Sequence, residues 1–260
     1  MTAPLFRIRG LSKLFPAPGD SDGEKSVKAL WDVNLDIEQG ECLLLAGSNG
    51  SGKTLLTRCL AGLLSPSSGE ILYRGTPLDR VKKLHCEAGL IFQDPDSQIV
   101  GETVEEDAAF GPLNAGFSKA EAKERANAAL KAFGLDDKRD VPPRRLSGGE
   151  KRRLAAAGIF AMGCGTVIMD EPFANLDYPG VLSFLEAIRD MKKEGKTLVI
   201  LTHELEKVLA FADRLVILHR GTIRDEGKPE AVLDRLDPSW GVRDPRRTYA
   251  KAEDCSWLGE

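Results

Sequence analysis

The feature that most constrains this chain is the octapeptide Gly47-Ser48-Asn49-Gly50-Ser51-Gly52-Lys53-Thr54, which fits the pattern G-x-x-x-x-G-K-[ST]. An apolar run, 42–46, precedes it and leucines at helical spacing follow it, so we expect a strand, a glycine loop and a helix in succession. Glycines let backbone N–H groups close around phosphate oxygens, and a helix N-terminus adds partial positive charge. Lys53 is expected to reach the β- and γ-phosphates of a nucleotide, and the Thr54 hydroxyl to ligate Mg²⁺. The alternative, a glycine turn that merely caps a helix, does not account for the Lys-Thr pair.

Composition sets outer limits on size and partners. With 260 residues there is room for one large domain, or for one domain plus a subdomain. The net charge of −4 gives no general electrostatic reason to bind nucleic acid. The five cysteines are scattered without a C-x-x-C pair, which favours reduced thiols in a cytosolic compartment. The N-terminus lacks the build of a signal peptide, and the longest weakly polar run, 154–169, is shorter than the ~20 residues that span a bilayer.

Strands and helices alternate along the chain, which predicts an α/β fold with a mostly parallel sheet around the phosphate loop. Two alternating segments, 5–9 and 29–37, indicate an antiparallel β subdomain ahead of this core. Within 94–145 a capping box at 118–121 opens an apolar stripe, so a helical subdomain is expected to be inserted there. We expect one nucleotide-binding domain over 1–236, with a further helix over 146–162, and a C-terminal tail of uncertain structure over 237–260.

Polar side chains follow several of the predicted buried strands. Asp170 ends the apolar run 166–169, where a phosphate-loop enzyme holds Mg²⁺, and Glu171 is placed to activate the attacking water. The alternative is a charge pair at a helix N-terminus. His203 ends another strand and could contact the γ-phosphate, although a lone histidine is often structural. Gln93 ends a third strand and could sense Mg²⁺ or water.

A second glycine-rich loop, Ser147-Gly148-Gly149, opens the helix predicted over 146–162. It is another helix N-terminus suited to anions, on a chain that already has one. One loop cannot reach a phosphate that the other already holds without long-range folding. A symmetric pair of chains, each lending its second loop to the nucleotide of its partner, would solve this.

Taken in order, these motifs resemble the full set of an ATP-binding-cassette ATPase over residues 4–235. The set comprises Lys53/Thr54, Gln93, Leu146-Ser147-Gly148-Gly149-Glu150, Asp170-Glu171, Leu176-Asp177 and His203. The resemblance implies that ATP and Mg²⁺ are bound and that Ser147, Gly148 and Gly149 contact the ATP of the partner chain. It also implies that Leu176 and Asp177 cross the interface between two cassettes, and that Phe15 stacks on adenine. The alternative for Phe15 is a core aromatic residue.

Three positions depart from the pattern of that family. Leu55 stands where a hydroxyl residue commonly follows the phosphate-loop Thr. Glu150 ends the second glycine loop in place of the commoner Gln, and Asn175 stands where a small residue is usual. None of these differences removes a predicted catalytic group.

A narrower resemblance covers the stretch between Gln93 and the helical segment. This stretch is similar to the ATPase subunits of energy-coupling-factor importers. Three segments carry the similarity: Phe92-Gln93-Asp94-Pro95-Asp96-Ser97-Gln98, Thr103-Val104-Glu105-Glu106-Asp107, and Ala109-Phe110-Gly111-Pro112 with Asn114. That family takes up transition-metal ions such as cobalt and nickel, or vitamins. The resemblance implies integral membrane transport subunits, a separate substrate-binding membrane protein, and a cassette dimer formed with itself or with a related ATPase. It places the chain peripherally on the cytoplasmic face of the cell membrane.

Two other functions are weighed against the importer. A soluble cassette ATPase acting on ribosomes or DNA generally has two tandem cassettes or a coiled-coil insertion, and neither is visible here. An exporter cassette is opposed only by Phe110-Gly111-Pro112. We expect the acidic segment 93–110 to grip the membrane subunit, the alternative being a solvated acidic loop. The transported substrate is not encoded in the residues of this chain.

Overall fold

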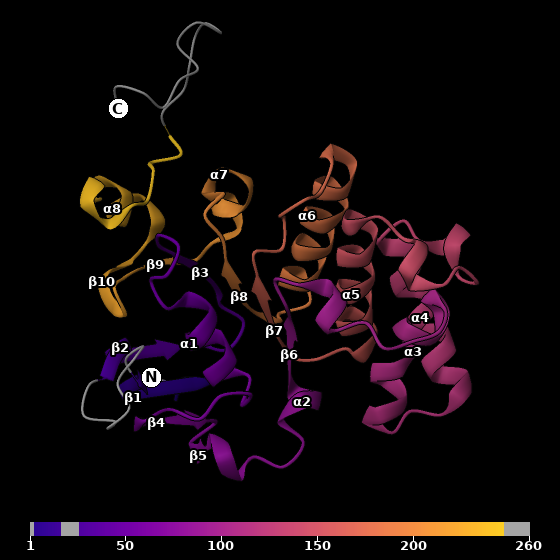
Figure 1. The fold of residues 1–260 in the computed structure, drawn as a ribbon, viewed down its shortest axis with the longest axis horizontal. Helices are drawn as coiled ribbons and strands as arrows, with labels where there is room; N and C mark the ends of the chain where they lie inside the picture. Colours follow the sequence, from indigo (N-terminus) through magenta and orange to yellow (C-terminus); the bar gives the residue numbers. More distant parts are fainter. Residues whose placement is uncertain (1–2, 17–25, 247–260) are drawn as a thin grey trace, which may run out of the picture.

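The computed structural model describes residues 3–16 and 26–246, in which strands and helices alternate along the chain (Figure 1). The strands are β1 (Phe6–Pro16), β2 (Ser26–Ile37), β3 (Cys42–Ala46), β4 (Ser68–Tyr73), β5 (Thr76–Pro77), β6 (Ala88–Ile91), β7 (Thr166–Asp170), β8 (Thr197–Leu201), β9 (Arg214–His219) and β10 (Thr222–Gly227). The α-helices are α1 (Lys53–Leu60), α2 (Leu84–Glu87), α3 (Val104–Ala115), α4 (Lys119–Ala132), α5 (Gly148–Met162), α6 (Tyr178–Lys193), α7 (Leu205–Val208) and α8 (Pro229–Asp234).

The larger sheet has six strands in the order β10-β9-β3-β8-β7-β6. All neighbours from β9 to β6 are parallel, and β10 pairs antiparallel with β9 at the edge. Every residue of β3, β6, β7 and β8 is buried, as expected of parallel strands covered on both faces. The predicted α/β fold with a mostly parallel sheet is confirmed.

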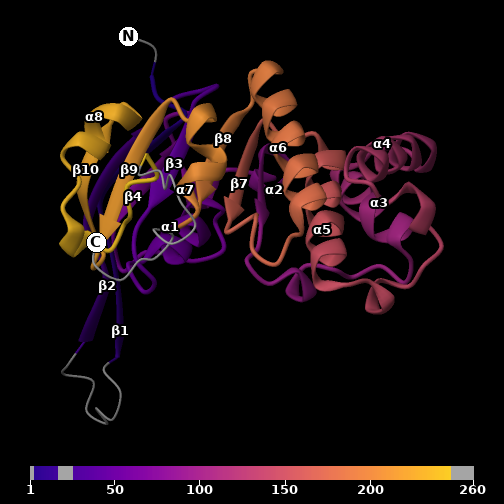
Figure 2. The same ribbon diagram turned by 90° about the horizontal axis from the view of Figure 1, so that it is seen from above.

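The smaller sheet is antiparallel, with the order β2-β1-β4-β5. Ile8 is the common centre, because it pairs with Leu35 on one side and with Ile71 on the other. This confirms the antiparallel β element expected ahead of the phosphate loop. β1 and β2 are longer than predicted: their pairing continues to Pro16 opposite Ser26, past the residues where apolar alternation is visible in the sequence (Figure 2).

Alternation along β3 divides its side chains between two cores. Leu43 and Leu45 face a cluster that includes Leu56 and Leu60 of α1 and Phe6 and Ile8 of β1. α1 therefore lies between the two sheets. The other face of β3 carries Cys42, Leu44 and Ala46 into a second cluster with residues of α3 to α6. The loop between β3 and α1 is thus fixed on both sides by packed structure.

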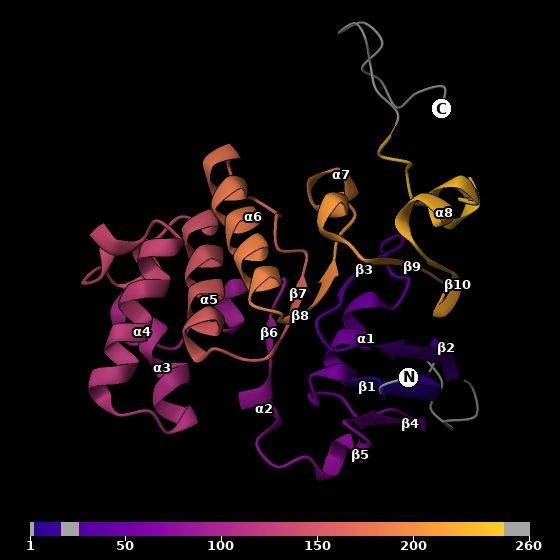
Figure 3. The same ribbon diagram turned by 180° about the vertical axis from the view of Figure 1, so that it is seen from behind.

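α3, α4 and α5 pack against one another at the end of the molecule away from the antiparallel sheet (Figure 3). The capping box predicted at Ser118 is present at the start of α4, and a second one, Ser147 with Glu150, starts α5. The stretch 104–115, for which sequence analysis placed no individual helix within the helical subdomain expected over 94–145, is the helix α3. Its N-cap is Thr103, whose hydroxyl accepts from the Glu106 N–H.

The end of the chain was expected to be a tail of uncertain structure from residue 237. Residues 238–240 instead form a 3₁₀ turn, and Trp240 packs against the core on the helical face of the large sheet. Cys255 and Trp257 lie outside the described residues. The cysteines within the described residues, Cys42, Cys59, Cys86 and Cys164, are free thiols. In the part of the chain that the structure describes, no helix has the length and apolar character needed to cross a membrane.

Candidate functional site

The phosphate loop connects β3 to α1 as the sequence predicted. Gly52 has a φ of 102°, a left-handed conformation that glycine adopts without strain. A Cβ at Gly47 would lie 2.1 Å from the Leu218 carbonyl oxygen of β9, so the loop passes directly against the neighbouring strand. The turn after β9 adds a hydrogen bond, because Gly221 N–H donates to the Ser51 carbonyl over 2.9 Å. The Ser51 hydroxyl is buried and has no hydrogen-bond partner among the described residues.

Lys53 folds back over this loop. Its Nζ donates to the carbonyls of Gly47 at 2.7 Å and Ser48 at 3.1 Å, and its side chain is buried. Burial lowers the pKa of Lys53, and the carboxylates of Glu171 and Asp170 oppose that shift. A buried ammonium group held only by carbonyls is a donor for a nearby anion.

Asp170 and Glu171 lie at the carboxyl end of β7. Burial raises the pKa of Asp170, whereas the Thr54 hydroxyl, which hydrogen-bonds the carboxylate, and Lys53 act in the opposite direction. Glu171 has a φ of 50°, unusual for a residue with a side chain. Its Oε2 lies 3.0 Å from Nδ1 of His203, which follows β8. A left-handed residue and a carboxylate–imidazole contact at the end of a buried strand are features of chemically active sites.

Arg152 of α5 is a site residue that sequence analysis missed. Its side chain is buried, and it donates to the Glu171 carbonyl at 2.6 Å and to the Gln93 carbonyl at 2.7 Å. One guanidinium group therefore ties the ends of β6 and β7 to α5. Burial lowers the pKa of Arg152, and the nearby carboxylates of Glu171, Asp170 and Asp94 counter this. The available signal was a run of three basic residues, Lys151 to Arg153, near the start of the helix, and such a run is usually solvated.

The phosphate loop, Asp170 and Glu171 border a cavity of about 310 Å³. Its lining brings together the phosphate loop and two of the strand ends that sequence analysis singled out, whereas His203 at the third does not line it. The lining residues are Ala29, Asn49, Gly50, Ser51, Gly52, Lys53, Thr54, Leu55, Gln93, Asp170 and Glu171. The cavity combines N–H donors, a lysine and two carboxylates. It can hold a phosphate chain together with a divalent cation.

Comparison with known proteins agrees with this geometry. The family model described as "ABC transporter" matches residues 30–174. The energy-coupling factor transporter ATP-binding protein EcfA of Methanocaldococcus jannaschii is 41% identical over 212 residues, which cover 80% of this chain and 76% of that protein. The cobalt import ATP-binding protein CbiO of Rhodobacter capsulatus is 41% identical over 248 residues, or 93% of this chain and 86% of that one.

The chain belongs to the ABC transporter ATP-binding family. It is an ATPase, as the sequence predicted. Among solved structures, cbiO1 from Clostridium perfringens, described as part of the ABC transporter complex cbiONQ, aligns with a TM-score of 0.74 at 34% identity and covers 89% of this chain and 91% of its own. The dimeric ABC transporter cassette MJ0796 aligns with a TM-score of 0.77 at 25% identity, covering 86% and 98%.

Other predicted site residues of this ABC ATPase do not line the cavity in the single chain. Ser147 and Gly148 are exposed at the start of α5, and Asp177, also exposed, is the N-cap of α6, where it accepts from Gly180 N–H at 3.0 Å. Phe15 is 39% exposed near the end of β1, with Lys13 Nζ 5.4 Å from its ring centre. Phe15 is therefore not a core residue, which excludes the alternative weighed for it.

Two departures from the family pattern have local explanations. Asn175 has a φ of 60°, and asparagine is one of the few residues that adopt this conformation readily. Glu150 accepts from the Ser147 N–H at 2.7 Å and forms an ion pair with Lys138. The commoner Gln at this position could not form that ion pair, because its amide carries no charge. Leu55, the third departure, lines the cavity and packs against the core beneath α1.

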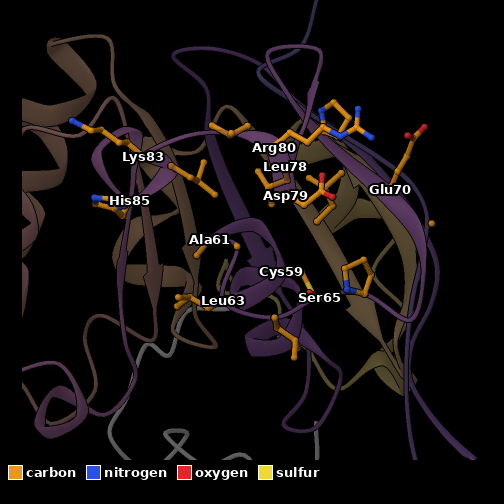
Figure 4. A pocket seen from close by; sticks show the side chains of 18 residues that line it. Cys59, Ala61, Leu63, Ser65, Glu70, Leu78, Asp79, Arg80, Lys83 and His85 are labelled. Atoms are coloured by element: carbon orange, nitrogen blue, oxygen red, sulfur yellow. The ribbon is translucent and has the colours of Figure 1, made fainter. Parts of the chain in front are cut away.

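A larger pocket, of about 690 Å³, lies outside the nucleotide site. It is bordered by the end of α1, by β4 and by the segment from Pro77 to His85 (Figure 4). Its lining includes none of the residues predicted to bind ATP or Mg²⁺. Size alone is therefore a poor guide to the chemistry of this ABC ATPase.

The acidic segment 93–110 is more ordered than sequence analysis expected. Asp107 is buried, and its Oδ1 accepts from the N–H groups of Val100 at 2.7 Å and Gly101 at 2.9 Å. Asp96 pairs with Lys151 at 2.6 Å, and Glu105 with Lys123 at 3.2 Å. Several of these carboxylates thus have partners within the chain. Asp107 is therefore part of the folded structure of this segment, which the alternative of a solvated acidic loop does not describe.

Proposed function

We propose that this chain is the ATP-hydrolysing subunit of a membrane importer of the energy-coupling-factor type, seated peripherally on the cytoplasmic face of the membrane. The observation that carries the proposal is the cavity in which the phosphate loop, Asp170, Glu171 and Gln93 meet. The similarity to EcfA and CbiO supports the transporter class. The name of CbiO, a cobalt import protein, supports cobalt as the substrate taken up, with another transition-metal ion such as nickel, or a vitamin, as the alternatives.

The residues of the cavity have separate tasks in this proposal. The N–H groups of Asn49 to Thr54 would cradle the phosphates, and Lys53 would turn from its carbonyl partners toward the β- and γ-phosphates. Mg²⁺ fits the donor set, because the Thr54 hydroxyl hydrogen-bonds the buried Asp170 and Gln93 borders the same cavity, giving only oxygen ligands. When bound, Mg²⁺ would neutralise charge on the phosphate oxygens.

Glu171 is the proposed general base. Its carboxylate borders the cavity, and the contact of its Oε2 with His203 Nδ1 orients it. Arg152 holds the main chain of Glu171 from below, so that the carboxylate keeps its place while the water is deprotonated. His203, 61% exposed in its side chain, would be free to contact the γ-phosphate.

The active unit is proposed to be a dimer of cassettes, formed with a second copy or with a related ATPase. Ser147 and Gly148 are exposed at the N-terminus of α5 and do not line the cavity of their own chain. In a head-to-tail dimer they and Gly149 would contact the ATP of the partner, and Leu176 and Asp177 would lie at the interface. The dimeric form of MJ0796 supports this arrangement.

The proposed partners in the membrane are an integral transport subunit and a separate substrate-binding protein. A groove of about 260 Å³ between α3 and α5 supports a docking role, and it is lined by His85, Gln98, Val100, Asp107, Phe110, Gly111, Asn114, Ala155, Gly158, Ile159 and Met162. The side chains of Val100 and Phe110 there are 60% and 50% exposed. Nucleic acid is not proposed as a partner.

The test is Glu171→Gln, which keeps the shape of the side chain and removes the base. Loss of a general base typically lowers the rate by about 10²–10⁴-fold, so hydrolysis should fall by that factor while ATP binding persists. Because ATP is then not consumed, the variant should elute from gel filtration as a dimer in ATP and as a monomer without it. Wild-type turnover in Glu171→Gln would contradict the assignment, and His203→Gln provides a comparison in which the base itself remains.

A further inference from the structure

The segment that follows α8 returns to the phosphate loop. After Asp237 caps the 3₁₀ turn Pro238–Trp240, the chain reaches Gly241, which lies against Ser48. No motif at these positions was singled out in the sequence. The contact joins a segment close to the end of the described chain to the first turn of the nucleotide site, 193 positions earlier in the numbering (241 minus 48).

The contact is close enough to require glycine. Gly241 has a φ of 70°, and a Cβ added there would lie 2.9 Å from Ser48 Cβ and 3.6 Å from Ser48 Oγ. A side chain at this position would therefore meet both a strained backbone and a neighbour within the phosphate loop. Neither the backbone strain nor the steric clash could be relieved without moving Ser48 or the turn itself.

Trp240 anchors the turn from the other side. Its side chain is partly buried against the core, and its carbonyl lies 3.3 Å from Nδ1 of His219, the last residue of β9. The preceding residue, Leu218, is the one whose carbonyl abuts Gly47. The first turn of the phosphate loop is thus bordered by β9 on the Gly47 side and by Gly241 on the Ser48 side.

Ser48 is a position where displacement matters. Its carbonyl accepts from Lys53 Nζ at 3.1 Å and from Ser51 N–H at 3.2 Å. Lys53 must exchange these carbonyls for phosphate oxygens when a nucleotide binds. The position of Ser48 therefore affects both the shape of the loop and the ease with which its lysine is released.

We propose that Trp240 and Gly241 are positioning residues for the nucleotide site, which hold the Ser48 turn of the phosphate loop and couple nucleotide binding to the C-terminal segment. The inference rests on the nucleotide site proposed above. By linkage, a contact that favours the binding-competent loop raises nucleotide affinity, and bound nucleotide in turn stabilises the contact. The chemistry at Glu171 lies on other strands and is not altered by it.

The main experiment compares Gly241→Ala with Gly195→Ala by calorimetric titration with ADP. Gly195 has a nearly identical φ of 74° but nothing within 4 Å of an added Cβ, so it controls for backbone strain alone. Gly241→Ala should bind ADP about tenfold more weakly, within the usual range of coupling energies. Gly195→Ala should bind as the wild type does. At saturating ATP the kcat of Gly241→Ala should stay near that of the wild type, so that the loss lies in KM.

A rescue variant separates positioning from general damage. Ser48→Gly removes the atoms that the methyl group introduced by Gly241→Ala would meet, so the double variant Ser48→Gly/Gly241→Ala should bind ADP nearly as well as Ser48→Gly alone. Unchanged ADP affinity in Gly241→Ala, or an equal loss in the double variant, would overturn the inference. Lys53→Ala tests the nucleotide site itself: ADP binding that survives that change would count against the proposed function instead.

A spectroscopic measurement covers the case in which Gly241→Ala does not fold. With Trp31→Phe and Trp257→Phe, Trp240 is the remaining tryptophan of the chain. Its emission should shift when ADP saturates the protein, because Trp240 and Ser48 flank the same contact. Emission that is unaffected by saturating ADP would contradict the coupling.

Discussion

At the residue scale, Arg152 shows how a buried charge can organise a site without contacting substrate. Its two terminal nitrogens serve two main-chain carbonyls, one from Gln93 and one from Glu171. The planar guanidinium spans both acceptors, which a lysine ammonium on a flexible stem cannot match. The conformation of Glu171, with its φ of 50°, is thus held by a hydrogen bond from α5 as well as by the Leu201 carbonyl, which accepts from its N–H at 2.9 Å.

Arg152→Lys should therefore lower both stability and turnover. A buried acceptor without a hydrogen bond costs about 1–3 kcal/mol. The free energy of unfolding, measured by urea denaturation, should therefore fall by about that amount. Turnover should fall as well because Glu171 loses its support, whereas ADP binding should change little. Arg189→Lys, at a half-exposed position beside Asp190, is the matched control and should behave as the wild type. Full turnover in Arg152→Lys would show that the Glu171 carbonyl needs no support from α5.

At the element scale, the start of α5 combines a capping box with an ion pair. Glu150 accepts from Ser147 N–H and pairs with Lys138, and these contacts lower the pKa of Glu150 to about 2, with Lys138 the larger cause. The corresponding box of α4 uses Ser118 and Glu121, where Ser118 is the larger cause of the lowered pKa. Both boxes satisfy helix N–H groups that otherwise lack a partner.

Glu150→Gln should change how stability depends on pH. A carboxylate with a lowered folded-state pKa contributes stability above its ordinary pKa of 4.5, and that contribution is lost as the pH falls toward about 2. After allowance for solvent screening of the Lys138 pair, the variant should be less stable than the wild type by about 1 kcal/mol at pH 7. The gap should close on acidification. Urea unfolding at pH 7, 4 and 3 measures it, with Glu121→Gln as control; a gap independent of pH would refute the ion-pair account.

Sequence patterns predicted the elements that have strong local signals. The parallel strands of the large sheet, the phosphate loop and the box at Ser118 are marked by apolar runs, glycines and a capping residue. The edge strand β10 has no apolar run and was not predicted. A helical subdomain was predicted over 94–145, but α3 was not placed within it, because the acidic first turn of Val104–Ala115 looks like a solvated loop and Pro112 stands inside the helix. Arg152 and Gly241 were missed because their partners, Glu171 and Ser48, are distant in sequence and only the fold brings them into contact.

At the scale of the whole molecule, α5 links three surfaces. Its N-terminus carries the exposed Ser147 loop, Arg152 in its second turn reaches Gln93 and Glu171, and Gly158 and Met162 line the groove beside α3. Fifteen residues of helix are about 22 Å long. A rigid element of that length can transmit a change at the nucleotide to a partner held in the groove.

The groove between α3 and α5 is accordingly the surface at which a membrane subunit is expected to dock. Asp107 holds the loop 98–103 against the start of α3, so its replacement would damage the fold and could not test docking. Val100→Asp places a charge on an exposed apolar rim at little cost in stability and should reduce co-purification of the membrane subunit. The ATPase rate of the isolated chain should stay unchanged, because Val100 does not line the nucleotide cavity.

Val27→Asp is the matched control for that variant, because Val27 is 49% exposed and lies on β2 instead of the groove. Glu105→Lys/Glu106→Lys tests the acidic face separately from the apolar rim. If positive charge on the membrane subunit contributes to docking, the double Lys variant should also co-purify less of the membrane subunit than the wild type does. This difference from the wild type should be smaller at high salt, where charges are screened. Loss of co-purification in Val100→Asp but not in the double Lys variant would assign docking to apolar contact. Full retention in both variants would place the docking surface elsewhere, for which the larger pocket bordered by Leu63 is the next surface to test.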